Sequence, residues 1–453
     1  MMKALRAFAP ALSLFLASCA APTAFYRDVD AGVAAGNYTD ALETVRSHRS
    51  AYGENSSVLY GLDMGALHHY AGNTDSSNAY LLAAEREIGD LYTKSISREA
   101  LAFVLNDNVL PYAGEDFEKV LVNVFLALNF AQQGLPDEAL VEARKVDLKL
   151  RDYAQQYEGK NAYQEDAFAR YLTGILYEST GEMNDAFIAY RKAHEAYTAY
   201  EKNFGTKAPT FLLNDLVRSA EMLSFTEFAD RYRELGGAPF KRSDLRGGSL
   251  VVIAYAGRSP IKTEVRPSVS IPDDHGTIHT FQIALPKFVP RMTGPRAYDV
   301  SVLRASDSST VASLRTELAE DVTAIAGRVL EDRLGLVYLK SGGRALLKFL
   351  AAEKAKSAVK KKSAEDGKGE TSGDRLTNLL SSLAIDLVVG ATESADVRTW
   401  RTLPAQFQIA RFMLPPGAYA VRAASPDGGY RLTNEVVHIR AGQSTFVLLD
   451  DIR

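Results

Sequence analysis

The sequence predicts an α+β protein of more than one domain, with a helical N-terminal half and a β-rich C-terminal half. Residues 22–240 are rich in Ala, Leu, Glu and Tyr, and their apolar positions recur every three or four residues, which indicates amphipathic helices. Residues 245–453 contain short β-branched and aromatic runs separated by Pro and Gly, which is typical of strands and turns. With 453 residues, the chain is too long for one ordinary core.

The N-terminus has the order of a cleaved export signal. Lys3 and Arg6 are basic, residues 7–16 are mostly apolar, and small residues lead to Cys19, the only cysteine. The apolar run is shorter than the roughly 20 residues that cross a bilayer. This order is typical of a secretory signal peptide, so we expect residues 1–18 to be removed.

The string Leu16-Ala17-Ser18-Cys19 resembles the lipobox of bacterial lipoproteins. The resemblance implies that the Cys19 thiol carries a diacylglycerol and that acyl chains, palmitate among them, anchor the mature chain in a membrane. Ala20 in the next position implies the outer membrane, facing the periplasm, rather than the inner membrane or the cell surface. The alternative is an ordinary signal peptide followed by an incidental cysteine. A lone thiol forms no internal disulfide, which favours lipidation.

The helical half contains a repeated frame. With Gly181 as a turn, Gly174 and Tyr177 on the first helix and Ala186 and Tyr190 on the second match the tetratricopeptide (TPR) skeleton. The same frame fits turns at Gly134, Gly72 and, more weakly, Gly36. The sequence therefore predicts a TPR-like α-solenoid over 22–240. An unrelated antiparallel helical bundle is the alternative.

A solenoid has a concave face, and the frame predicts which side chains line it. The candidate groove-lining residues are His69, Tyr70, Leu128, Gln132, Tyr171 and Glu178. This lining is mainly apolar and lacks the Lys, Arg and Asn cluster that would hold a carboxylate terminus. Two occupants remain open, part of this chain or an apolar helix of a partner. We favour the first, because large exposed apolar patches are uncommon on soluble monomers.

The C-terminal half predicts an antiparallel β-rich module with a helical insertion at 310–400. A Lys/Ser/Glu/Gly tract at 357–374 predicts a disordered charged loop within that insertion. Trp400, the only tryptophan, is expected in the core or at a domain interface. The expected strands are 249–256, 269–271, 279–285, 298–303, 405–413, 417–424, 435–439 and 444–449.

No catalytic pattern stands out in the chain. The sequence has no Gly-x-Ser-x-Gly elbow, no P-loop and no His-Glu-x-x-His. The loop Asp273–His279 has residues that bind metals, but turn chemistry explains it better. Glu115, Asp116 and Glu118 precede an apolar run and are expected to be first-turn helix acids. We therefore expect no enzyme activity, no cofactor and no metal, and a net charge of −4 predicts no binding to nucleic acid.

Several strings together resemble a family of uncharacterised outer-membrane lipoproteins with TPR-like helices. They are Tyr112–Asn123, Leu140–Arg144, Asp166–Gly174, Trp400–Pro404 and Leu414–Tyr419. The resemblance brings no reaction, but it implies envelope partners such as other lipoproteins or a cell-wall synthase. The expected function is a protein-protein interaction or assembly scaffold of the cell envelope. The alternatives are an activator of, or an enzyme in, peptidoglycan metabolism, and a surface or secretion-system component.

Overall fold

The computed structural model describes residues 24–93, 110–157, 161–240, 246–272, 278–291, 297–335, 337–343, 394–425, 430–432 and 436–451. The signal peptide, Cys19 and the charged loop at 357–374 lie outside these residues. The chain is mixed helix and sheet, with a helical N-terminal region and a sheet-rich C-terminal part, as the sequence predicts.

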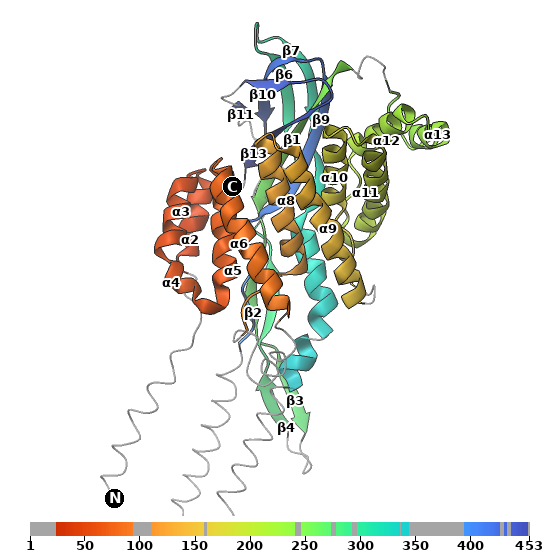
Figure 1. Ribbon diagram of the computed structural model, residues 1–453. Helices are drawn as coiled ribbons and strands as arrows, with labels where there is room; N and C mark the ends of the chain where they lie inside the picture. Colours follow the sequence, from red (N-terminus) through yellow and green to blue (C-terminus); the bar gives the residue numbers. More distant parts are fainter. Residues whose placement is uncertain are drawn as a thin grey trace, which may run out of the picture.

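The N-terminal region is an array of antiparallel helical hairpins (Figure 1). Within the described part of the chain, each hairpin packs on the next through the contacts α3–α5, α6–α8, α9–α10 and α11–α12. A short helix, α4 (Arg49–Tyr52), follows the first hairpin. The hairpins are α2 (Tyr26–Ala34) with α3 (Tyr38–Ser47), α5 (Ser57–Tyr70) with α6 (Thr74–Thr93), α8 (Asp116–Gln132) with α9 (Pro136–Gln156), α10 (Ala167–Ser179) with α11 (Met183–Phe204), and α12 (Thr210–Met222) with α13 (Thr226–Glu234).

The hairpins share one turn geometry. Gly181 has a φ of 83°, its N–H donates to the carbonyl of Glu178, and the next N–H donates to the carbonyl of Tyr177. This pair of bonds satisfies the last carbonyls of the first helix and needs a left-handed residue, which glycine adopts without strain. Gly36, Gly72 and Gly134 repeat the pattern, and Ser224 (φ 61°) repeats it in the last hairpin.

The main sheet has the strand order β13-β1-β9-β8. Its central strand β1 is buried along ten of its eleven residues, which explains why 249–256 is a continuous apolar run rather than an alternating one. Tyr255 of β1 and Phe407 and Arg411 of β9 contact side chains of the helices. The strands are β1 (Gly248–Arg258), β8 (Glu317–Asp321), β9 (Pro404–Leu414) and β13 (Ser444–Asp451).

A second sheet shares the same core, and two ribbons extend from the opposite end of the molecule (Figure 1). The second sheet joins β6 (Asp299–Arg304), β7 (Thr310–Arg315), β10 (Gly417–Ala424), β11 (Tyr430–Leu432) and β12 (Val437–Ile439). The ribbons pair β2 (Ile261–Val265) with β5 (Leu285–Val289) and β3 (Ser268–Pro272) with β4 (Ile278–Gln282).

Two sequence expectations for the C-terminal half are wrong. The helical insertion does not begin at 310, because β7 and β8 occupy 310–321 and helix begins at 322. Pairing with β6 and β9 overrides the local helical texture there. The module is not wholly antiparallel either, since β1 and β13 pair in parallel.

Candidate functional site

The main sheet occupies the inner face of the helical array. Tyr70 donates from its hydroxyl to the carbonyl of Thr402 at 2.9 Å. His69 contacts Asn129 Oδ1 through Nδ1 at 2.6 Å and the Tyr255 hydroxyl through Nε2 at 2.7 Å. The amide oxygen can only accept, so Nδ1 carries the proton and Nε2 accepts from the tyrosine. Burial lowers the pKa of His69 to about 4, which keeps this neutral form.

The aromatic side chains at this interface form a continuous cluster. Phe125 of α8 stacks on Tyr255 of β1 and lies 5.6 Å from the ring of Trp400. Phe407 of β9 lies 5.2 Å from Phe168 of α10. Trp400 is fully buried, so its expected place in the core or at an interface is confirmed. Of the two occupants considered for the groove, the structure shows the chain's own sheet.

The remaining lining candidates divide into three kinds. Leu128 is fully buried. Tyr171 and Glu178 are drawn into a polar network with β9. Gln132, the last residue of α8, is exposed and therefore does not line the covered face.

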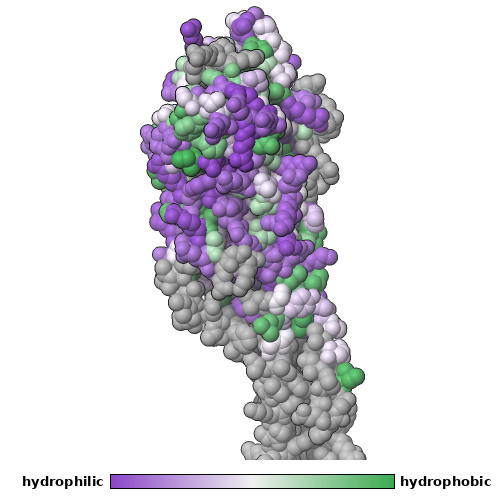
Figure 2. All heavy atoms as spheres, turned by 90° about the vertical axis from the view of Figure 1, so that its right-hand side faces the viewer, coloured by the Kyte–Doolittle hydropathy of each residue, from purple (hydrophilic) through white to green (hydrophobic). Residues whose placement is uncertain are grey.

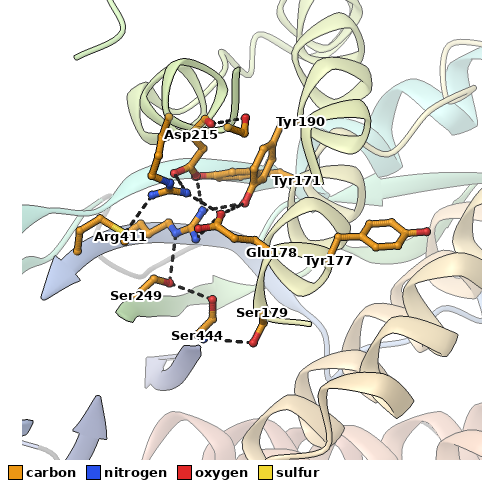
Figure 3. A network of polar contacts seen from close by, with 12 residues as sticks. Tyr171, Tyr177, Glu178, Ser179, Tyr190, Asp215, Ser249, Arg411 and Ser444 are labelled. Carbon is orange, nitrogen blue, oxygen red and sulfur yellow. Dashed lines mark hydrogen bonds and ion pairs between the residues drawn. The ribbon is translucent and has the colours of Figure 1, made fainter. Parts of the chain in front are cut away.

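That network centres on Arg411, which points from β9 toward the helices (Figure 3). Its guanidinium donates to Asp215 at 2.6 Å, to the Tyr190 hydroxyl at 2.9 Å and to Glu178 at 2.9 Å. Arg218 donates to the same two carboxylates, at 2.6 Å to Glu178 and 2.8 Å to Asp215. Two cations therefore face two anions, and the network is neutral.

The network keeps Glu178, Arg218 and Arg411 charged although they are buried. Burial raises the pKa of Glu178, but Arg218 and Arg411 outweigh burial and hold that pKa below its usual value. Burial opposes the charge on Arg411, yet Asp215 and Glu178 hold its pKa above the usual range. The quartet connects residues of three elements by ion pairs. Its chemistry suits the joining of α10 and α12 to β9.

A second buried junction involves Glu118, an expected first-turn acid of α8. Its carboxylate accepts from the backbone of Glu115 and Trp400 at 2.9 and 2.8 Å, and from the Thr399 and Tyr112 hydroxyls. The contact with Glu115 completes a capping box, as a helix start requires. The contacts with 399–400 were not predicted. Burial and the neighbouring Glu115 raise the pKa of Glu118.

Asp63 of α5 makes a third junction. It accepts from the hydroxyls of Tyr26 at 2.6 Å, Tyr52 at 2.8 Å and Thr402 at 2.9 Å. These donors stabilise the anion, but burial has the larger effect and raises the pKa of Asp63 to about 6. The residue therefore links three helices to the segment that enters β9.

The outer face of the array carries a charged cleft of about 550 Å³. Ala196 and Ala199 of α11 are its uncharged lining residues. Figure 2 shows the right-hand side of the molecule, where hydrophilic side chains predominate and hydrophobic ones are scattered. The charged lining residues are Asp147, Arg151, Glu165, Arg170, Lys192 and Glu195.

The cleft's anions are largely engaged by one arginine. Arg170 pairs with Asp147 at 2.6 Å and with Glu165. Lys192 lies 3.9 Å from Asp147, and the Arg151 side chain donates to the backbone of Asp147 at 3.3 Å. Arg151, Lys192 and Glu195 are exposed, so charges of both signs are accessible in this cleft.

The remaining candidate features are the Asp273–His279 loop, the lipidation site, metal sites and membrane-spanning helices. Residues 273–277 of the Asp273–His279 loop lie outside the described residues, as does Cys19. In the part of the chain that the structure describes, no cluster of three His, Cys, Asp or Glu side chains has the arrangement of a metal site. None of the described helices has both the length and the apolar character needed to cross a membrane.

Comparison with known proteins gives little similarity. No family model and no curated protein matches the sequence. Two solved structures, titled MamA AMB-1 and MamA MSR-1, resemble the chain with TM-scores of 0.29 and 0.28 at 16% and 15% identity. Each covers 47% of this chain, and the matches span 87% and 94% of those structures. A likeness at this level establishes neither a family nor a function.

Proposed function

We propose that the protein is a lipid-anchored interaction scaffold of the bacterial cell envelope. The observation that supports this proposal is the hairpin array held on its own sheet, with a charged cleft on the outer face. Stacked helical hairpins expose extended surfaces, and many such arrays bind other proteins. Because the sheet fills the inner face, a partner would bind the outer face.

We also propose that the hairpins are TPR-like repeats. At the close-packing position, a Cβ on Gly174 would lie 2.4 Å from the Tyr190 ring, and one on Gly65 would lie 2.5 Å from Leu81. The TPR frame requires a small residue at this position, where the second helix crosses the first. The shared turn geometry of the hairpins supports the same assignment.

The cleft between α9 and α11 is the proposed partner site. Arg151, Lys192 and Glu195 present exposed charges of both signs there, so the cleft suits a charged segment of a partner. The lipobox-like string at Cys19, followed by Ala20, supports a location on the periplasmic side of the outer membrane. The acylated cysteine would specify the location, and the cleft would specify the partner.

Site-specific photocrosslinking in intact cells tests this proposal. A crosslinker at Arg151 or Lys192 should give discrete products with envelope proteins. The matched control is Arg304, whose side chain is 57% exposed on the second sheet and away from the array. The charge reversals Arg151→Glu and Lys192→Glu should reduce recovery of the same partner in pull-downs, whereas Arg304→Glu should not. Failure to recover any envelope partner would refute the scaffold role.

The anchor has its own test. Cys19→Ser should abolish acylation and leave uncleaved precursor or released protein. A variant that is cleaved and still fractionates with membranes would contradict the anchor.

A further inference from the structure

One end of the molecule is an arm with its own small core. The arm consists of the ribbons β2–β5 and β3–β4 together with the helical residues 337–343. Ile283 and Leu285 are buried in it, and Val337 packs against them. The Ser341 hydroxyl contacts the carbonyl of Ala284 at 3.5 Å, which joins the helix to the ribbons. Figure 1 shows the ribbons and the cyan helix extending below the helical array.

The arm exposes apolar side chains. Ile278 on β4 and Leu339 on the helix are each 69% exposed, more than any other large apolar side chain that the structure describes. Tyr338, beside Leu339, is 47% exposed, and Val265 at the end of β2 is 39% exposed. Clustered exposed apolar residues mark contact surfaces, and tyrosine is favoured where an apolar phase meets water.

The first described helix is fixed to the root of this arm. Asp30 of α2 pairs with Arg291, just after β5, at 2.7 Å. It also lies 3.6 Å from Arg258, at the end of β1, and 3.5 Å from Arg401. One carboxylate among three guanidiniums holds α2 beside the point where β2 and β5 leave the body of the molecule.

The chain also enters the array on the arm's side. The Phe25 ring packs on His48 and lies 5.4 Å from Tyr52 of α4, and Figure 1 shows α4 at the end of the array nearest the arm. Phe25 is six positions after Cys19 in the sequence, so the two are at most about 20 Å apart. A bilayer holding Cys19 would therefore lie on the side from which the arm projects.

We propose that the arm contacts the surface of the phospholipid bilayer that holds acylated Cys19, with Ile278, Tyr338 and Leu339 entering its interfacial layer. The proposal rests on the lipid anchor of the proposed function. Interfacial binding grows with the buried apolar area, and a second attachment strengthens a lipid anchor. Contact at two points would also fix the orientation of the array relative to the bilayer. Its outer cleft would then open to the periplasm in a direction parallel to the membrane surface, and not toward the membrane.

Vesicle flotation with the unlipidated chain tests the arm separately from the anchor. The protein is residues 19–453 with Cys19→Ser, and the vesicles are phosphatidylethanolamine and phosphatidylglycerol at about 3:1. We expect a fraction of the protein to float with the vesicles. The double variant Ile278→Asp/Leu339→Asp should reduce that fraction at least fivefold. The matched control is Val141→Asp/Leu148→Asp, because these side chains are 51% and 54% exposed on α9, and it should float like the parent chain.

Three outcomes would overturn the proposal. The first is that the parent chain does not float with the vesicles, and the second is that both double variants lose flotation equally. The third is that the parent chain forms a dimer in size-exclusion chromatography and the arm variant does not. The last outcome would show that a second copy of the chain covers this surface. Circular dichroism of each variant checks that the fold is retained. Mass spectrometry of the N-terminal peptide of the native protein reports acylation separately, so failure of the anchor and failure of the arm are distinguishable.

Discussion

At the scale of single residues, Arg411 has the largest expected effect. Replacing it with methionine leaves two buried carboxylates with only Arg218 as a countercharge. Breaking one partner of a buried ion pair typically costs about 3 to 5 kcal/mol, because the remaining charge stays buried. We expect Arg411→Met to lower the free energy of unfolding by that amount in urea titrations.

The control is Arg304→Met, whose side chain is 57% exposed, and it should change stability by less than about 0.5 kcal/mol. Equal stability of the two variants would show that the quartet does not join the helices to the sheet.

Asp63 predicts a pH dependence of stability. Its carboxyl has a usual pKa of 3.8, raised by burial to about 6 in the folded chain. The folded state therefore keeps the proton where the unfolded state has lost it, and stability falls as the pH rises from about 4 to about 6. The shift corresponds to about 2 to 3 kcal/mol. Asp63→Asn removes this pH-dependent contribution to the free energy of unfolding. As the pH rises from 4 to 7, the variant should therefore become more stable relative to the native chain by that amount.

The measurement compares the unfolding free energies of the two proteins at each pH, which cancels the other titrating groups. His69 acts in the opposite direction, because its lowered pKa makes the fold less stable below about pH 6.5. A constant difference between the Asp63→Asn variant and the native chain would contradict the shift.

For the buried polar contacts between the helices and the main sheet, the sequence predicts the residues on the helices but not their partners on the sheet. The repeat frame identifies Tyr171 and Glu178, because it follows from local spacing. It does not identify Arg411, which lies 233 residues from Glu178 along the chain. The available signal is the arginine itself, since a charged residue in the apolar run of β9 needs a buried countercharge. Local periodicity does not indicate which helix supplies it.

At the scale of elements, the close-packing glycines give a sharp test. A Cβ on Gly174 would overlap the Tyr190 ring, so Gly174→Ala should destabilise the protein by about 1 to 3 kcal/mol. Gly89 of α6 is the control, because a Cβ there meets nothing within 4 Å. Gly89→Ala should stabilise the protein by up to about 1 kcal/mol through helix propensity. Thermal unfolding that shifts in the same direction for both variants would refute the close packing.

The sequence predicts the hairpins where glycine marks the turn. It misses the last hairpin, because Ser224 adopts the left-handed conformation that the frame assigns to glycine. Serine carries no sequence signal for that conformation, and tertiary packing enforces it. β7 and β8 are missed for a related reason, since their strand conformation depends on partners far along the chain.

At the scale of the whole molecule, the helical array and the main sheet share one hydrophobic core. Residues 22–240 and 245–453 differ in sequence texture, which predicts two domains. Phe125 and Phe168 of the array nevertheless pack against Tyr255 and Phe407 of the sheet. Composition reveals the change of secondary structure, but it does not reveal that one half covers the apolar face of the other.

This shared core predicts the behaviour of the isolated array. A chain ending at residue 240 would expose the inner face and leave Glu178, Asp215 and Arg218 without Arg411. We expect it to be helical but to self-associate and bind the dye ANS, because exposed apolar faces of this kind aggregate. Light scattering and size-exclusion chromatography would measure this, with the chain of residues 24–453 as the control. A monomeric, cooperatively unfolding array would contradict the prediction and leave the inner face available to a partner.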